Sequence, residues 1–273
     1  MLGAGVSATG AALGGSIYTT LIEPQWLSVE RLDVPLARLP RELDGFTIAQ
    51  LSDLHLGPYV GVEEIRSAVA ATNQLRPDAI VLTGDYVTRE ADRMDECARE
   101  LGALSATSGV YAVLGNHDYW SGPEHIARVL NEQSIAVLIN AALPIERHGA
   151  RLWMAGVDDV WERRADLAST LRFVPQHEPT ILLAHEPDYA EVAKQQPIDL
   201  QLSGHSHGGQ VRLPYWGAPI LPYLGKQYPI GLQRAADLWV YTNRGIGVVS
   251  PPVRFNCRPE ITLLTLRQRT DLG

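Results

Sequence analysis

The chain has 273 residues, of which 45% are hydrophobic, and its formal net charge is -8 at pH 7. This length and composition allow a sizeable core in one large domain or two small ones. The negative charge argues against general affinity for nucleic acid, because proteins that bind the phosphate backbone usually present a basic stripe. The two cysteines, Cys97 and Cys257, lie far apart in the sequence, which excludes a disulfide framework.

The N-terminal segment carries no charge between Leu2 and Ile22, and the first charged residue is Glu23. Its length is about that of a membrane-spanning helix, although its glycines reduce helix propensity and hydrophobicity. No Lys or Arg precedes it, as the basic region of a signal peptide would require. We expect residues 1–22 to be a membrane anchor or export-signal segment and residues 23–273 to form one globular domain. The alternative is a buried or disordered glycine-rich tail.

Strands and helices then alternate along the chain. Short apolar runs bounded by turn residues predict buried strands at 45–52, 78–83 and 110–114. Helices are expected between them, at about 62–75 and 92–104. This alternation predicts a largely parallel sheet with helices on its faces.

The second half of the chain repeats the arrangement. Strands are predicted at 180–184 and 199–203, on either side of a helix near 189–195. The apolar runs at 239–241 and 261–266 indicate further strands, which we expect to come from a second sheet.

Five short polar blocks each follow directly on the end of a predicted strand. Loops at the carboxyl ends of strands converge on one edge of an open α/β sheet, so the five blocks are expected to meet at one site. The blocks are Asp53-Leu-His55, Gly84-Asp85, Gly115-Asn116-His117-Asp118, His185 and Gly204-His205-Ser206-His207.

These blocks contain side chains that bind metal ions. Asp53 and His55 are two residues apart in an extended segment, so both can reach one cation. Asp85 can bridge two cations through its two carboxylate oxygens. Asn116 offers a neutral amide oxygen, and the histidines at 185, 205 and 207 offer imidazoles. A donor set without thiolate fits two divalent metal ions, Mn²⁺, Fe²⁺ or Zn²⁺.

In this order, the blocks resemble the calcineurin-like metallophosphoesterase superfamily from about residue 45 to 266. Ser52-Asp-Leu-His-Leu-Gly57, Gly204-His-Ser-His-Gly-Gly-Gln210 and Asn243-Arg-Gly-Ile-Gly247 are similar to a bacterial branch of exported or membrane-tethered phosphohydrolases. Members of that branch often begin with a twin-arginine signal or an anchor helix, and the twin arginines are absent here. The resemblance implies a four-layer α/β/β/α sandwich of two mixed sheets, with a dinuclear metal site at the C-terminal edge of the strands.

The resemblance also implies a role for each site residue. It makes His117 the catalytic residue, which stabilises the transition state or protonates the leaving group after in-line attack by a metal-bridging hydroxide. One metal would take Asp53, His55, Asp85 and His207, and the other would take Asp85, Asn116, His185 and His205.

One position departs from the family pattern. In many relatives a carboxylate three residues beyond the bridging Asp orients the catalytic histidine, and here that position is Thr88. Asp118 and Glu90 are the candidates to replace it.

The expected function is metal-dependent hydrolysis of a phosphodiester, pyrophosphate or phosphomonoester bond. The substrate is a phosphate-ester small molecule or a lipid-linked molecule of the cell envelope. The aromatic and proline-rich stretch 210–232 is either an apolar rim for such a substrate or an ordinary surface loop. We expect association with the membrane through residues 2–22, at the cell membrane or after export rather than in the cytoplasm.

Three alternatives stay open: a catalytically silent metal-binding envelope module, a protein phosphatase and a purely structural tethered domain. The only sequence support for the silent module is the absence of a carboxylate at position 88, which is Thr88 here. The protein phosphatase is disfavoured because Thr88-Arg-Glu stands where those enzymes have Asp-Arg-Gly. Other polar residues are left out of the expected site: His125, His148 and His177 as solvated or capping histidines, Asp158 and Asp159 as a turn, and Arg244 and Arg254 because no pattern places them at the metals.

Overall fold

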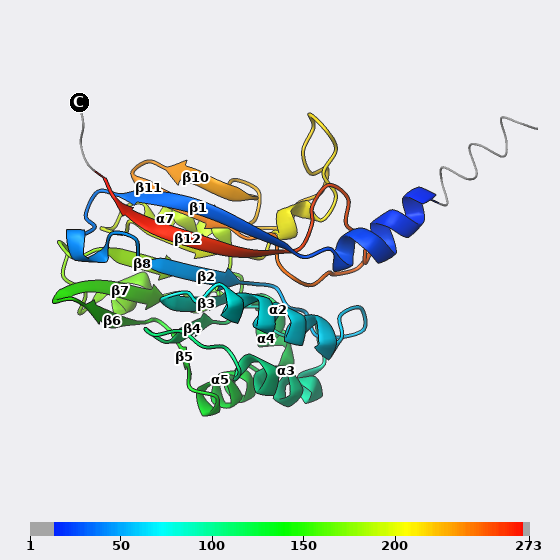
Figure 1. Ribbon diagram of the computed structural model, residues 1–273, viewed down its shortest axis with the longest axis horizontal. Helices are drawn as coiled ribbons and strands as arrows, with labels where there is room; N and C mark the ends of the chain where they lie inside the picture. The colour runs from blue at the N-terminus through cyan, green and yellow to red at the C-terminus, as the bar shows by residue number, and fades with distance from the viewer. Residues whose placement is uncertain (1–13, 270–273) are drawn as a thin grey trace, which may run out of the picture.

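Two six-stranded sheets lie face to face in the computed structural model, which describes residues 14–269 (Figure 1). In spatial order, the first sheet contains β1 (Ser28–Leu36), β12 (Glu260–Gln268), β2 (Thr47–Leu51), β3 (Ala79–Thr83), β4 (Val110–Val113) and β5 (Ile135–Val137). The second contains β10 (Gly231–Ala235), β11 (Leu238–Thr242), β9 (Leu200–Ser203), β8 (Thr180–Leu183), β7 (Ala150–Gly156) and β6 (Ala141–Arg147).

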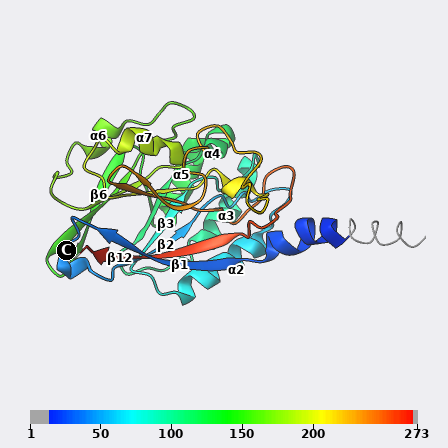
Figure 2. The same ribbon diagram turned by 90° about the horizontal axis from the view of Figure 1, so that it is seen from above.

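Helices cover the outer face of each sheet (Figures 1 and 2). The helices α2 (Val62–Gln74), α3 (Met94–Leu101) and α5 (Pro123–Glu132) contribute to the apolar cluster on the first sheet. The short helices α6 (Leu167–Leu171) and α7 (Ala190–Ala193) contribute to the cluster on the second. The result is the predicted four-layer α/β/β/α sandwich.

Both sheets are mixed. The strands β2, β3, β4 and β5 are parallel, and β12 enters antiparallel to β2. In the second sheet, β7, β8, β9 and β11 are parallel, with β6 and β10 antiparallel at the two edges. Parallel strands are covered on both faces, which explains why their sequences are continuous apolar runs.

The residues of β3 illustrate how the core divides. Successive side chains of a strand point to opposite faces of the sheet. Accordingly, Ala79 and Val81 join the cluster between the two sheets, while Ile80 and Leu82 join the cluster beneath the helices.

Most predicted elements are confirmed, with two helices shorter than expected. The region 92–104 forms the 3-10 turn η4 (Ala91–Arg93) and α3, which ends at Leu101. The region 189–195 forms η5 (Pro187–Tyr189) and the single turn α7. The run 239–241 lies in the second sheet as expected, but the assignment of 261–266 to that sheet is wrong. Those residues belong to β12, which pairs with β1 and β2, because an apolar run does not encode its partner.

The N-terminal helix projects away from the two sheets (Figure 1). Helical residues 14–17 continue into η1 (Tyr18–Ile22) and η2 (Glu23–Gln25). The carbonyl of Thr19 accepts the main-chain N–H of Arg254 at 2.8 Å, and the buried carboxylate of Glu23 accepts the N–H of Cys257 at 2.5 Å. Residues 1–13 of the expected anchor lie outside the described residues. Within 14–269, no helix combines the length and hydropathy that crossing a membrane requires.

Candidate metal centre

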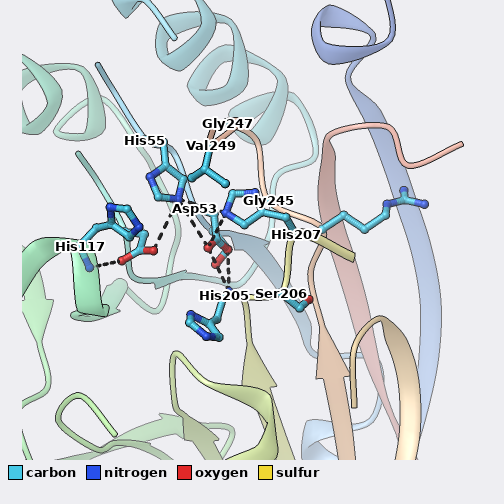
Figure 3. Close-up of polar contacts among 12 residues, drawn as sticks. Asp53, His55, His117, His205, Ser206, His207, Gly245, Gly247 and Val249 are labelled. Carbon is cyan, nitrogen blue, oxygen red and sulfur yellow. Dashed lines mark hydrogen bonds and ion pairs between the residues drawn. The ribbon is translucent and has the colours of Figure 1, made fainter. Parts of the chain in front are cut away.

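The five polar blocks meet at one edge of the two sheets. They follow β2, β3, β4, β8 and β9, and the block after β4 begins the short helix α4 (Asn116–Ser121). Figure 3 shows the imidazoles of His55 and His207 beside the carboxylate of Asp53, with His117 and His205 on either side. Every expected ligand is at most 6% exposed: Asp53, His55, Asp85, Asn116, His185, His205 and His207.

The backbone at these strand ends turns through an unusual conformation. Five of the seven residues have a positive φ: Asp53, His55, Asp85, His205 and His207. Non-glycine residues adopt this left-handed conformation rarely, and its strain is concentrated at functional sites. Here it turns short polar side chains back toward one point.

Asp53, His55 and His207 form the first cluster. The Nε2 atoms of the two histidines lie 3.1 Å apart, and Oδ1 of Asp53 lies 3.4 Å from Nε2 of His207. Burial lowers the pKa of His55 to about 3 and holds the pKa of His207 well below its usual value. Both imidazoles are therefore neutral, the form that binds a metal.

Asp85 lies between this cluster and His185. Its Oδ2 atom is 3.5 Å from Nε2 of His55 and 3.2 Å from Nε2 of His185. Burial acts to raise the pKa of Asp85, but the charge and hydrogen bond of His185 outweigh burial and hold the pKa well below its usual value. Donor atoms of Asp53, Asp85 and His185 lie within 4.8 Å of one another, as do those of Asp53, His55 and His207. An ionised Asp85 is thus placed to bridge two cations.

Main-chain carbonyls fix two of the imidazoles. Nδ1 of His185 donates to the carbonyl of Thr83 at 2.6 Å, so Nε2 is the ring nitrogen that faces Asp85. Nε2 of His205 donates to the carbonyl of Tyr223 at 2.7 Å. This leaves the unprotonated Nδ1 as the atom that can bind a metal. Such contacts set the tautomer and orientation of metal-binding histidines.

Asn116 supplies a further observation that fits a metal. Its Oδ1 atom is buried and has no hydrogen-bond partner among residues 14–269. A buried amide oxygen without a partner is costly, and a divalent cation satisfies it. The donor set as a whole, carboxylates, imidazoles and one amide, suits divalent metals.

His117 lies beside the cluster and is partly exposed. Its ring meets the ring of His55 edge-on, with centroids 4.7 Å apart. Its Nδ1 atom lies 2.7 Å from the carbonyl oxygen of Thr88, so Nδ1 donates and Nε2 is directed away from that contact. The main chain of Thr88 therefore performs the orienting role expected of a carboxylate at that position.

Neither candidate replacement carboxylate contacts His117. Asp118 instead accepts the main-chain N–H groups of Asp85, Tyr86 and Gly115 at 2.8 to 2.9 Å. Glu90 accepts the N–H of Arg89 at 2.8 Å. The expectation that one of them orients His117 is wrong, because Asp118 points into the loops and ties two ligand blocks together.

The segment 243–247 explains one of the family motifs. The N–H of Gly247 donates to the carbonyl of Asp53 at 2.7 Å. A Cβ at Gly245 would lie 2.7 Å from Cβ of Asp53, so only glycine allows the segment to approach the ligand. Arg254 is fully buried, which no sequence pattern had indicated. It donates to the carbonyls of Gly247 and Cys257 at 2.6 and 2.8 Å. Its guanidinium thus holds this segment in place.

An apolar groove continues from the cluster. It encloses about 510 Å³ and has Asp85, Asn116, His117, His205 and His207 at its base. Its walls come from four parts of the chain, and the apolar residues among them are Trp120, Trp161, Val211, Pro219, Ile220, Pro222, Val249, Pro251 and Val253.

Trp161 is a wall residue that the sequence analysis missed. Its ring lies 5.7 Å from the ring of His205 and 6.0 Å from that of Trp120, between centroids. The buried carboxylate of Glu186 accepts the N–H of Trp161 at 3.2 Å, and Asp159 accepts the N–H of Glu162 at 2.6 Å. The turn expected at 158–159 is therefore buried, and it carries an aromatic side chain to the groove.

The chain matches known proteins over most of its length. The family model described as calcineurin-like phosphoesterase matches residues 46–209. Phosphodiesterase YaeI of Escherichia coli is 35% identical over 267 residues, which cover 95% of this chain and 96% of that protein. Uncharacterized metallophosphoesterase YkuE of Bacillus subtilis is 33% identical over 271 residues, which cover 98% and 95%.

Among solved structures, TT1561 of Thermus thermophilus shares the fold, with a TM-score of 0.51 and 15% identity over 74% of this chain and 90% of that one. The family model, the relatives and the convergence of the seven predicted ligands agree. The chain belongs to the calcineurin-like phosphoesterase family.

Proposed function

We propose that this phosphoester hydrolase cleaves a phosphodiester or pyrophosphate bond in a substrate with an apolar group, such as a lipid-linked molecule of the cell envelope. The observation that carries this proposal is the groove of about 510 Å³, which begins at the candidate ligands and is walled by apolar side chains. A phosphate at the metals would place one of its substituents in that groove.

The two metals are assigned by position. Asp53, His55, Asp85 and His207 would hold one, and Asp85, Asn116, His185 and His205 the other. The donor types favour Mn²⁺, Fe²⁺ or Zn²⁺. When bound, two such cations lower the pKa of water and neutralise charge on the phosphate.

His117 is the proposed catalytic residue. The carbonyl of Thr88 occupies Nδ1, so Nε2 is the atom that exchanges a proton with the leaving oxygen. The ring is packed between His55 and Trp120, with centroids 4.7 Å from each. This packing orients the imidazole before substrate binds. The contact with Thr88 also removes the sequence argument for a catalytically silent module, since no carboxylate is needed to orient His117.

The proposed location is the cell membrane or the cell envelope, with residues 1–22 as anchor or export signal and 23–273 as the catalytic domain. This location would bring the groove near lipid-linked substrates. It rests on the uncharged stretch from Leu2 to Ile22.

The test compares two diesters that release the same nitrophenolate, methyl p-nitrophenyl phosphate and dodecyl p-nitrophenyl phosphate below its micelle concentration. Because burial of alkyl groups is favourable, kcat/KM for the dodecyl diester is expected to be at least about tenfold higher with Mn²⁺-loaded full-length chain.

Matched variants locate the effect. Val253→Ser, in the groove, should reduce the preference for the dodecyl diester, whereas Phe173→Ser, an exposed apolar residue outside the groove, should leave it unchanged. Equal kcat/KM values for the two diesters would reject the apolar substrate class. Absence of turnover on both, in metal-loaded protein, would reject the hydrolase itself.

A further inference from the structure

Three segments that meet at one end of the molecule contain no acidic residue of their own, although Glu30, Glu63 and Asp188 lie beside them. The segments 14–22, 211–227 and 246–259 contain no Asp or Glu, although the chain has 31 such residues and a net charge of -8. The same three segments carry the cations Arg212, Lys226 and Arg258 at the surface, while Arg254 is buried. The surface they form is called the acid-free end below.

Hydrogen bonds join the three segments into one surface. The N–H of Arg254 donates to the carbonyl of Thr19 at 2.8 Å. Phe255 donates to the carbonyl of Gln210 and accepts from the N–H of Arg212, each at 2.9 Å. In Figures 1 and 2, the yellow hairpin, the orange-red loop and the blue N-terminal helix lie at the same end of the sandwich.

Large apolar side chains are exposed on this end. The hairpin closed by hydrogen bonds between Leu213 and Gly217, at 2.8 and 2.9 Å, carries Tyr215 and Trp216 at its tip. Trp216 is 87% exposed and Tyr215 is fully exposed, while Ile220 is 78% exposed. A protein in water rarely exposes such a cluster without a partner.

The chemistry of the patch indicates what that partner is. Tyr and Trp concentrate where membrane hydrocarbon meets water, because their rings are apolar and their edges polar. Cations near an anionic membrane surface are attracted to it, and carboxylates would be repelled. The uncharged residues 2–13 precede Gly14 at this same end, so the chain that leads into the expected anchor starts there.

We propose that the acid-free end docks on the surface of an anionic lipid bilayer, with Tyr215 and Trp216 in the interface and Arg212 and Lys226 near the lipid phosphates. This docking is independent of the reaction proposed above, because it requires neither metal nor turnover. Since Ile220 both belongs to the exposed patch and lines the groove, docking places the mouth of the groove against the membrane.

The test uses full-length chain with an environment-sensitive thiol dye at Trp216→Cys. Both native cysteines are buried, and unsubstituted protein controls for their labelling. The matched position is Phe173→Cys, which is 78% exposed and lies before the start of β8, at the opposite edge of the second sheet. The vesicles contain phosphatidylcholine and phosphatidylglycerol in equal parts.

Vesicles are expected to shift the emission of the dye at position 216 to the blue and to protect it from iodide several-fold, with no change at position 173. Equal iodide quenching at the two positions would overturn the proposal even if the N-terminal segment held the protein on the vesicles. Failure of the full-length chain to sediment with the vesicles would also overturn it.

A charge-reversal pair provides a second measurement that does not depend on labelling. Lys226→Glu should weaken binding to the anionic vesicles about fivefold or more, whereas Arg172→Glu, with the same change in net charge beside Phe173, should not. Equal effects of the two variants would show only a net-charge effect and would contradict docking by this end. Vesicle binding that persists in a chain without hydrolase activity would separate this proposal from the proposed function.

Discussion

The imidazole of His117 is held by the main-chain carbonyl of Thr88, whose oxygen lies 2.7 Å from Nδ1. A carbonyl accepts a hydrogen bond as a carboxylate does, but it adds no charge and does not depend on the side chain at that position. The protein therefore orients His117, the proposed general acid, without the acidic residue that often has this role in the superfamily.

This contact predicts that the side chain of Thr88 is dispensable. Thr88→Ala should leave kcat for a diester with an alkyl leaving group within about twofold, whereas His117→Gln should lower it by at least about a hundredfold, because a poor alkoxide leaving group depends on the general acid. Steady-state rates of the two purified variants check this. A loss in Thr88→Ala as large as that in His117→Gln would show that the hydroxyl, rather than the carbonyl, orients the ring.

Asp118 is predicted to stabilise the fold around the site rather than to act in the reaction. Its carboxylate accepts three main-chain N–H groups from two ligand blocks, and Asp118→Ala would leave them buried without partners. We expect a loss of about 2–4 kcal/mol in the free energy of unfolding, measured in urea.

The matched variant is Asp118→Asn, which retains one acceptor oxygen and should lose clearly less than Asp118→Ala. A similar stability of Asp118→Ala and the unsubstituted protein would contradict this role.

Asp159 is predicted to make stability depend on pH. Burial, aided by the charge of Glu186, raises the pKa of Asp159 to about 9, far above the value of about 3.9 in an unfolded chain. Between these values Asp159 is protonated in the folded state and ionised in the unfolded state, so its contribution to the free energy of unfolding decreases as pH rises from about 4 to about 9.

Asp159→Asn cannot ionise and should therefore show a shallower decrease over that window. Urea unfolding at a series of pH values measures the slope. Identical slopes for the variant and the unsubstituted protein would show that Asp159 does not retain its proton on folding.

Gly115 is predicted to be required for space rather than for backbone freedom. Its φ of -113° suits any residue, but a Cβ there would lie 2.8 Å from Nε2 of His185. Gly115→Ala should displace this imidazole and weaken metal binding about tenfold or more, an effect comparable to loss of a contact that orients a ligand.

The control for Gly115→Ala is Gly102→Ala, at which a Cβ meets only the flexible side chain of Gln133. Calorimetric titration with Mn²⁺ compares the two variants. Unchanged Mn²⁺ affinity in folded Gly115→Ala would refute the steric argument.

Local patterns predicted the parallel strands and the meeting of the seven candidate ligands, because parallel strand order brings C-terminal loops to one edge. Local patterns did not predict elements that depend on contacts between residues far apart in the sequence. The edge strand β1 alternates exposed and partly buried residues over much of its length and is defined by pairing with β12, more than 200 residues away.

The roles of two residues near the site were not predicted, for the same reason. Trp161 reaches the groove because Glu186 accepts its N–H, and Arg254 acts through main-chain carbonyls. Neither contact leaves a periodic or motif-like trace in the sequence.

The central claim is that the converging side chains form a metal-dependent phosphoesterase centre. Stepwise addition of Mn²⁺ to metal-free full-length protein, with hydrolysis of bis(p-nitrophenyl) phosphate followed at each step, tests it most directly. We expect no turnover without metal, a rise that saturates near two equivalents, and at least about a hundredfold loss in Asp85→Asn, which lacks the proposed bridging carboxylate. Turnover that persists without metal, or that Asp85→Asn retains in full, would contradict it.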